Sequence, residues 1–278
     1  MNEFRAPRWL PGGHVQTIWP VLFSRRFDGA PPVFRRERWT TPDGDFVDVD
    51  WQGEALDVPL LVLFHGLEGS SSSHYAQAIA AEAKRRGWRF AVPHFRGCSG
   101  EINLAPRAYH SGDHEEVGWM LARFRELHAG PIVAVGVSLG GNALLRFVEE
   151  AGAGAAERVR AVAAISAPLD LAAGGRAIGR GFGRQVYTRM FMRTMKKKAL
   201  VKLRQHPGLF DAKAMRAACD LRDFDEIFTG PLHGFAGADD YYARSSAKAH
   251  LDRIRIPALV LNARNDPFLP ASALPRPD

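Results

Sequence analysis

Disulfide bonds cannot organise this chain, because its 278 residues include only two cysteines, Cys98 and Cys219. The small secreted folds that depend on a disulfide framework are therefore excluded. A chain of this length also buries enough apolar surface to fold without covalent cross-links. We predict a cytoplasmic protein, since a reducing compartment is the usual location of such a chain.

Long apolar runs are also absent, and none approaches the ~20 residues that a membrane-spanning helix requires. The N-terminal stretch is apolar but is interrupted by two prolines and two glycines, at Pro11, Gly12, Gly13 and Pro20. Such interruptions argue against a signal peptide. The sequence has no evident repeats, and its 46% hydrophobic and 24% charged residues predict an ordinary globular protein.

Acidic residues are outnumbered by basic ones, and the net charge is +7. The basic residues are spread along the chain, with local clusters at 35–36, 84–86 and 196–198. Because no basic motif with interleaved aromatic residues is present, we expect no nucleic-acid site. We interpret the charge as a solvated basic face; attraction to anionic lipid or acidic substrates is the alternative.

Apolar runs alternate along the chain with segments of helical periodicity. The runs typical of buried strands are 59–66, 88–97, 131–138, 159–168 and 256–263, and the helical segments include 73–87, 113–130 and 139–152. Strands that alternate with helices form a mostly parallel sheet with helices on both faces. We therefore predict an α/β fold and a single domain over residues 1–278.

Two short patterns predict local structure. Asp43-Gly44 lies between stretches of β-branched and aromatic residues, which is typical of a β-hairpin turn. Asp113 precedes a helical segment and Glu116 follows three residues later, so a capping box is expected at that helix start.

Residues 168–247 interrupt the alternation of strands and helices. The segment begins with a glycine-rich stretch and continues into a basic amphipathic stretch with Met190, Phe191, Met192 and Met195. It follows the sixth predicted strand, where an insertion would lie over the ends of the strands. We predict an inserted lid that shapes a substrate pocket; the alternative is a set of ordinary helices packed on the sheet.

Ligands of parallel sheets bind beyond the carboxyl ends of the strands, so the residues that follow strands are candidates for the site. They are His65, His94, Ser138, Ser166 and Asp266. Gly136, Ser138 and Gly140 form the pattern G-x-S-x-G between a buried strand and a helix, which is the signature of a nucleophile elbow. The N-terminus of the following helix also favours negative charge that develops near the serine.

A serine nucleophile needs a base and a pair of N–H donors for the oxyanion. We expect the donors to be the backbone amides of Leu139, directly after the serine, and of Leu67, in the loop after a buried strand. Asp266 lies 128 positions after Ser138 and is the expected triad acid, which would orient a histidine and stabilise its charged form. An ordinary turn aspartate is the alternative reading of this residue. Weaker candidates for the acid are Asp225, Asp239 and Asp240.

Three other groups have side chains suited to catalysis or metal binding. His65 lies beside the expected oxyanion loop and is more naturally a support for that loop than a base. His110 and His114 have helical spacing with Asp113 between them, but no third metal ligand is evident. Cys98 has no paired base in the sequence. We therefore expect neither a metal nor an organic cofactor.

Several motifs together resemble those of a known family. They are "WLPGGHVQTIWP", "DGDFVDVDW", "LVLFHGLEGSSSSHY", "PHFRGCSGE", "APRAYHSGD", "GVSLGGNAL" and "NARNDPF", which run from Trp9 to Phe268. The chain resembles the YheT-like branch of the α/β-hydrolase superfamily, whose animal relatives are lipid-directed hydrolases. The resemblance implies an α/β-hydrolase fold and a serine esterase or lipase, with Ser138 as the nucleophile and Asp266 as the acid.

The triad histidine is where the sequence departs from that family. The resemblance implies a further short strand and a loop rich in glycine and histidine after Asp266, and the printed chain stops at Asp278 before either. All ten histidines precede Asp266. We expect the chain to be truncated before its last strand and its base. The alternatives are a true end with binding but no catalysis, and the use of another histidine.

These observations predict a hydrolase of carboxylic esters with apolar acyl groups. Its partner is a small-molecule or lipid ester, and peripheral contact with a membrane is a further expectation. The alternative from another class is a non-catalytic lipid- or membrane-associated binding protein. Thioester or amide hydrolysis is not distinguished from ester hydrolysis by the fold. The oligomeric state and the physiological substrate are not determined by these patterns.

Overall fold

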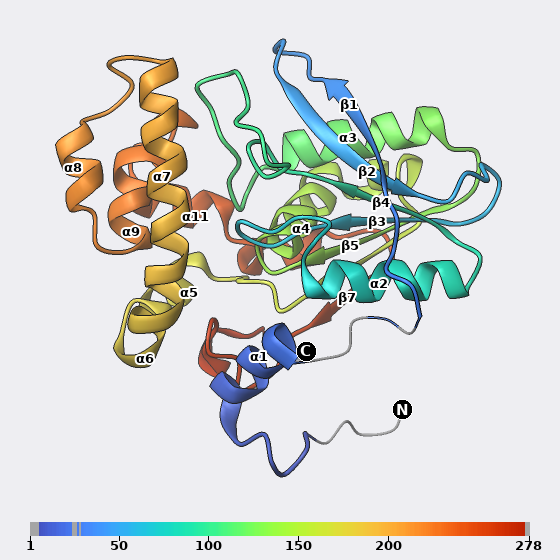
Figure 1. Ribbon diagram of the computed structural model, residues 1–278, viewed down its shortest axis with the longest axis horizontal. Helices are drawn as coiled ribbons and strands as arrows, with labels where there is room; N and C mark the ends of the chain where they lie inside the picture. Colours follow the sequence, from blue (N-terminus) through green and yellow to red (C-terminus); the bar gives the residue numbers. More distant parts are fainter. Residues whose placement is uncertain (1–5, 24–26, 28, 276–278) are drawn as a thin grey trace.

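A computed structural model describes residues 6–23, 27 and 29–275 as a sheet between layers of helices (Figure 1). The strands of the described residues are β1 (Arg35–Thr40), β2 (Phe46–Gln52), β3 (Leu60–Phe64), β4 (Arg89–Pro93), β5 (Ile132–Val137), β6 (Ala161–Ile165) and β7 (Ala258–Leu261). They form one sheet in the order β1-β2-β4-β3-β5-β6-β7. The β1–β2 and β2–β4 pairs are antiparallel, and the other pairs are parallel. The mostly parallel sheet of the prediction is confirmed.

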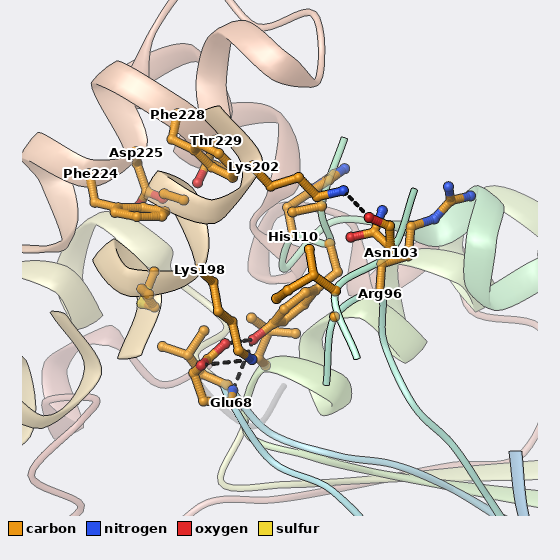
Figure 2. A pocket seen from close by; sticks show the side chains of 18 of the residues that line it. Glu68, Arg96, Asn103, His110, Lys198, Lys202, Phe224, Asp225, Phe228 and Thr229 are labelled. Atoms are coloured by element: carbon orange, nitrogen blue, oxygen red, sulfur yellow. Dashed lines mark hydrogen bonds and ion pairs between the residues drawn. The ribbon is translucent and has the colours of Figure 1, made fainter. Parts of the chain in front are cut away.

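An insertion between β6 and β7 forms a helical layer of its own. It contains α5 (Leu171–Ile178), α6 (Gly181–Gly183), the π-helical turn η2 (Arg184–Thr188), α7 (Arg189–Gln205), α8 (Ala212–Ala217), α9 (Leu221–Phe224), the π-helical turn η3 (Asp225–Thr229), α10 (Gly230–Leu232) and α11 (Ala238–Ser245). Helices α7 to α9 and the turn η3 share a small apolar core that includes Met192, Met215 and Phe228. One contact of helix α7 with the rest of the protein is made by Lys202, whose Nζ donates to the carbonyl oxygen of Asn103 (Figure 2).

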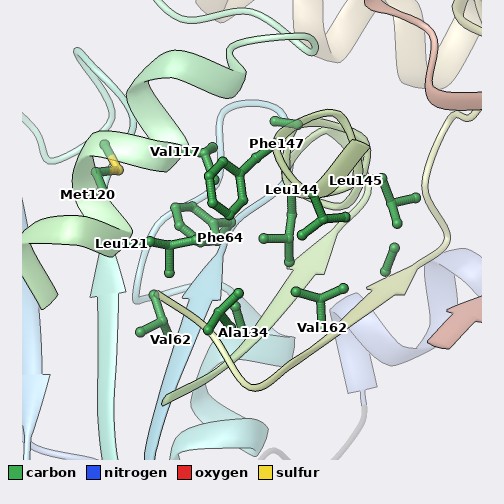
Figure 3. Close-up of a cluster of buried hydrophobic side chains, with 14 of the residues drawn as sticks. Val62, Phe64, Val117, Met120, Leu121, Ala134, Leu144, Leu145, Phe147 and Val162 are labelled. Atoms are coloured by element: carbon green, nitrogen blue, oxygen red, sulfur yellow. The ribbon is translucent and has the colours of Figure 1, made fainter. Parts of the chain in front are cut away.

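Apolar side chains fill both faces of the sheet, because alternate residues of the buried strands point in opposite directions. On one face, Val62 and Phe64 of β3 pack with α3 (His114–Leu127) and α4 (Leu139–Ala151) (Figure 3). On the other face, Leu63 packs with α2 (His74–Arg85). Helices on both faces are therefore confirmed, and the core holds the carboxyl ends of β3, β5 and β6 in a fixed relation.

The two local predictions have different outcomes. The hairpin is confirmed, since Thr40 of β1 pairs with Phe46 of β2 and Gly44 adopts a φ of 75° in the turn. The capping box is wrong, although Asp113 does immediately precede α3. The carboxylate of Asp113 instead accepts from Arg107 at 2.8 Å, and that of Glu116 accepts from Arg96 at 2.7 Å. Both carboxylates are thus bound by arginines, whose planar guanidinium groups offer paired donors with matching geometry, and Asp113 makes no side-chain bond to the helix start.

Helix α1 (Gly12–Phe23) and several short 3₁₀ turns lie outside the central sheet and the insertion. Helix α1 lies near the end of β7 in Figure 1. Short 3₁₀ turns occur at η1 (Gly152–Glu157), η4 (Ala247–Arg253) and η5 (Ala271–Ala273). Within the described residues, the length and apolar character of every helix fall short of what crossing a bilayer requires.

Candidate active site

Ser138 occupies a strained turn between β5 and α4. Its φ of 53° and ψ of −123° lie in a region that residues with a Cβ rarely adopt, and such strain clusters at functional sites. Its N–H donates to the carbonyl oxygen of Ile165 on β6 at 2.9 Å, which ties the turn to the neighbouring strand. The backbone therefore holds Ser138 at the carboxyl edge of the sheet.

The flanking glycines are required by close packing around this turn. A Cβ on Gly136 would overlap the carbonyl oxygen of Gly140, and a Cβ on Gly140 would lie 2.5 Å from the carbonyl oxygen of His65. Only glycine leaves room for these backbone contacts. The pattern G-x-S-x-G thus has a steric reason in this structure.

Two cavities share part of their lining, and Ser138 lines one of them. One, of about 110 Å³, is lined by Ser138 itself and by apolar side chains of the insertion, among them Leu171, Ile178 and Phe191. The other, of about 70 Å³, lies between the loops after β3 and β4 and helix α7 (Figure 2). The residues that line both are Leu67, Leu139, Met195, Asp225 and Tyr241. The insertion therefore forms part of the wall of each cavity.

The two expected oxyanion donors lie at the junction of the cavities. Leu139 is the first residue of α4, so its N–H has no acceptor within the helix. Leu67 lies in the loop after β3, where the preceding N–H, that of Gly66, donates to the hydroxyl of Tyr75 at 2.8 Å. Both residues line both cavities. Their placement is compatible with a pair of donors, and the role itself stays a prediction.

Asp266 follows β7, at the same edge of the sheet as Ser138. The parallel pairing of β5 with β6 and of β6 with β7 places the ends of these strands side by side. An oxygen of Asp266 accepts from the N–H of Phe268 at 2.8 Å. Burial raises the pKa of the Asp266 carboxyl, and the bond from Phe268 lowers it only in part. Phe268 lines the cavity of Ser138, whereas Asp266 does not.

Histidines are absent from the described residues that line the Ser138 cavity. His65 is fully buried, its Nδ1–H donates to the carbonyl oxygen of Gly66 at 2.8 Å, and its Nε2 accepts from the N–H of Phe95 at 3.0 Å. Burial and the neighbouring His94 lower the pKa of His65 to about 3. With both ring nitrogens occupied, His65 is suited to support the loop and not to accept a proton.

The metal-site and cysteine alternatives gain no support from the geometry. His110 Nδ1 accepts from the N–H of Gly112 at 3.2 Å, and the carboxylate of Asp113 is bound to Arg107. The described part of the chain holds no group of three side chains arranged to bind a metal ion. Burial raises the pKa of the Cys98 thiol to about 12, so the reactive thiolate is scarce at neutral pH.

Several polar residues near the cavities are marked weakly or not at all by the sequence. Asp225, which was only a weak candidate for the triad acid, lines both cavities and accepts from the hydroxyl of Tyr242 at 2.8 Å. Glu68, Tyr109 and Lys198 form a connected group beside Leu67. No local pattern marks these residues, because each comes from a different part of the chain.

The fold and the strained serine turn define the class to which this protein belongs. A sequence model of the α/β hydrolase fold matches residues 59–278, and the chain belongs to that family. Among curated relatives, it is 40% identical to YheT of Escherichia coli (strain K12), named as a proposed esterase, over 99% of this chain and 81% of that protein. It is 30% identical to phospholipase ABHD3 of Mus musculus, over 94% of this chain and 67% of that protein. The predicted YheT-like membership is therefore confirmed.

Solved structures support the same fold. A puromycin-hydrolysing peptidase of Mycobacterium tuberculosis matches with a TM-score of 0.54 at 19% identity, over 87% of this chain and 32% of that chain. An esterase of Pyrococcus furiosus matches with a TM-score of 0.50 at 15% identity, over 87% of this chain and 74% of that chain. At these identities the likeness shows the fold alone, and the predicted α/β-hydrolase fold is confirmed.

Proposed function

We propose that this protein is a serine hydrolase of carboxylic esters. The observation that carries the proposal is the strained turn that places Ser138 at the wall of a cavity, directly before the N-terminus of α4. Relatives named as an esterase and a phospholipase support an ester as the substrate. Strained backbone clusters at functional sites, and a nucleophile elbow presents its serine on such a turn.

The proposed reaction has two steps. The Oγ of Ser138 attacks the ester carbonyl carbon while its proton passes to a base, and the amides of Leu67 and Leu139 bind the oxygen that becomes negative. The C–O bond to the alcohol then breaks, and the alcohol leaves with the proton from the base. Water attacks the acyl–serine ester in the same way, releasing the acid and restoring the hydroxyl of Ser138.

We propose that the base is a histidine oriented by Asp266. The described histidines do not line the Ser138 cavity. Burial raises the pKa of Asp266, because the hydrogen bond from Phe268 does not fully offset the cost of ionising the buried carboxyl. An imidazolium beside this carboxylate would supply that compensation and would lower its pKa.

The cavity supports an apolar acyl group as part of the substrate. The insertion contributes Leu171, Ile178, Phe191 and Met195 to the wall of the Ser138 cavity, and Phe268 contributes from the loop after β7. Apolar walls with a few placed polar groups are typical of sites for small molecules. We propose that the insertion is a lid over this pocket and that the substrate is a small-molecule or lipid ester.

A non-catalytic lipid-binding protein is the second candidate. It is favoured by the same lack of a histidine at the described cavity wall, and by large apolar side chains that are exposed on and beside α1, including Trp9, Trp19, Leu22 and Phe23. Such residues suit contact with the interface of a membrane. Reaction with a fluorophosphonate distinguishes the candidates, because that reagent requires an activated serine.

The test is fluorophosphonate labelling together with hydrolysis of p-nitrophenyl esters, each with and without added imidazole as a substitute base. We expect Ser138 to be labelled, imidazole to raise the rate, and Ser138→Ala to lower imidazole-supported hydrolysis by at least ~10³-fold while the protein stays folded. Rates equal to those of Ser138→Ala under every condition would favour the binding protein. Turnover retained in that variant would remove the serine from the nucleophile role.

A further inference from the structure

The loop that contains Leu67 is held in a strained conformation. The next residue, Glu68, has a φ of 57°, in the left-handed region that favours glycine. Its N–H donates to the hydroxyl of Tyr109 at 2.9 Å, and that hydroxyl donates to Glu68 Oε1 at 2.9 Å. The ring of Tyr109 stacks on Phe95 with 5.3 Å between centroids. Tyr109 therefore holds both the backbone and the side chain of Glu68.

The second oxygen of Glu68 is bound by the insertion. Lys198 Nζ, on helix α7, lies 2.9 Å from Glu68 Oε2, and the two side chains are 33% and 12% exposed (Figure 2). An ion pair that is partly removed from water is screened less than a surface pair and fixes geometry more firmly. This pair joins the insertion directly to the loop after β3.

The ion pair lies next to the proposed oxyanion donor Leu67, and this location indicates its role. Glu68 follows Leu67, and one turn of α7 separates Lys198 from Met195, which lines both cavities together with Leu67 and Leu139. A left-handed residue other than glycine persists only where its surroundings hold it. Release of Glu68 would let the peptide groups on either side of it rotate, and with them the Leu67 N–H.

We propose that Lys198 and Glu68 are positioning residues, which hold the Leu67 amide in the orientation that receives the oxyanion. The inference rests on the proposed function, and it makes docking of helix α7 a condition for a complete oxyanion hole. Lys198 touches neither the serine nor the reacting atoms in this scheme, so it acts through Glu68. Loss of the pair weakens binding of the transition state more than binding of the substrate.

The test compares Lys198→Met with Lys196→Met. Lys196 lies on the same helix, but its Nζ donates to the carbonyl oxygens of Arg216 and Ala218, both within the insertion. We expect Lys198→Met to lower kcat for imidazole-supported ester hydrolysis roughly 10- to 100-fold, the scale of a misplaced catalytic group, with KM within about two-fold. The fluorophosphonate labelling rate is expected to fall in parallel. Lys196→Met is expected to leave both rates near those of the original protein.

Further variants separate positioning from folding. Lys198→Arg is expected to retain most of the rate, and the paired exchange Glu68→Lys with Lys198→Glu is expected to recover part of what each single change loses. Circular dichroism confirms that each variant is folded. The inference is overturned if Lys198→Met is labelled as fast as the original protein, if Lys196→Met is slowed equally, or if only KM changes. Failure of the original protein to exceed Ser138→Ala would instead overturn the proposed function.

Discussion

The pKa of a carboxyl group in this protein is raised or lowered from its ordinary value according to the groups that contact it. Burial opposes the ionisation of Asp43, yet hydrogen bonds from Arg96 and Thr41 lower its pKa to about 2. Asp225 has no such cation, and burial raises its pKa to about 7 against the hydrogen bonds from Thr229 and Tyr242. A buried carboxyl without a cationic partner is costly to ionise, and Asp225 lies in the wall of both cavities.

We expect Asp225→Asn to change how stability depends on pH. The folded pKa of Asp225 is raised above its ordinary value of 3.8, so the unfolded chain releases this proton first. The free energy of unfolding of the original protein therefore falls as the pH rises from about 4 to 7 through this group. Asparagine does not titrate, so the stability of the variant relative to the original protein should increase over that range.

Urea denaturation at several pH values between 4 and 8 measures this difference. Asp252→Asn is the matched control, because Asp252 is an exposed aspartate on η4. A difference between the Asp225→Asn variant and the original protein that stays constant with pH would show that Asp225 titrates normally.

Among the elements, helix α1 and the loop after β7 are the pair most relevant to the site. Gly13 packs so closely that a Cβ would overlap the carbonyl oxygen of Asn265, the residue before Asp266. Asn265 Nδ2 also donates to Gln16 Oε1 at 2.9 Å. The start of the chain therefore supports the loop that holds the proposed triad acid.

We expect Gly13→Ala to displace this loop. Overpacking of this kind destabilises by about 1–3 kcal/mol, and the fluorophosphonate labelling rate of Ser138 should fall as Asp266 moves. Thermal unfolding and labelling kinetics measure the two effects. Gly154→Ala is the control, since no atom lies within 4 Å of its added Cβ. A labelling rate that stays unchanged in Gly13→Ala would mean that α1 does not position the acid.

At the scale of the whole molecule, the outer edge of β7 exposes apolar side chains. Within the described residues β7 pairs only with β6. Leu259 and Leu261 on this strand are 58% and 55% exposed. An apolar strand with one free edge is a template for pairing with another chain, which proteins usually prevent with charges or a covering segment.

The 278-residue chain is therefore expected to self-associate through β7, and Leu261→Lys is expected to reduce that association. Light scattering over a range of protein concentrations measures the mean particle mass. Leu104→Lys provides the control, because Leu104 is 57% exposed but lies in a loop. If the Leu261 and Leu104 variants behave alike, added charge alone and not the strand edge explains the change.

How far the sequence predicts this protein depends on the range of the interactions involved. The alternation of strands and helices, the hairpin at Asp43-Gly44 and the glycine-flanked turn at Ser138 were all predictable. Each depends on side chains within a few positions of one another. The capping box at Asp113 failed because Arg107 and Arg96 compete for the same carboxylates, and nothing in the local pattern weighs that competition.

The sequence by itself determined the order of the elements, the family and the serine turn, since periodicity and glycine sterics act over short distances. Only the tertiary structure decided that Glu68, Tyr109 and Lys198 meet beside Leu67, and that Gly13 supports the loop before Asp266. These contacts join segments far apart in the chain. They form because the side chains of the sheet, the insertion and α1 pack closely and are restricted to single conformations. No local sequence pattern encodes that packing.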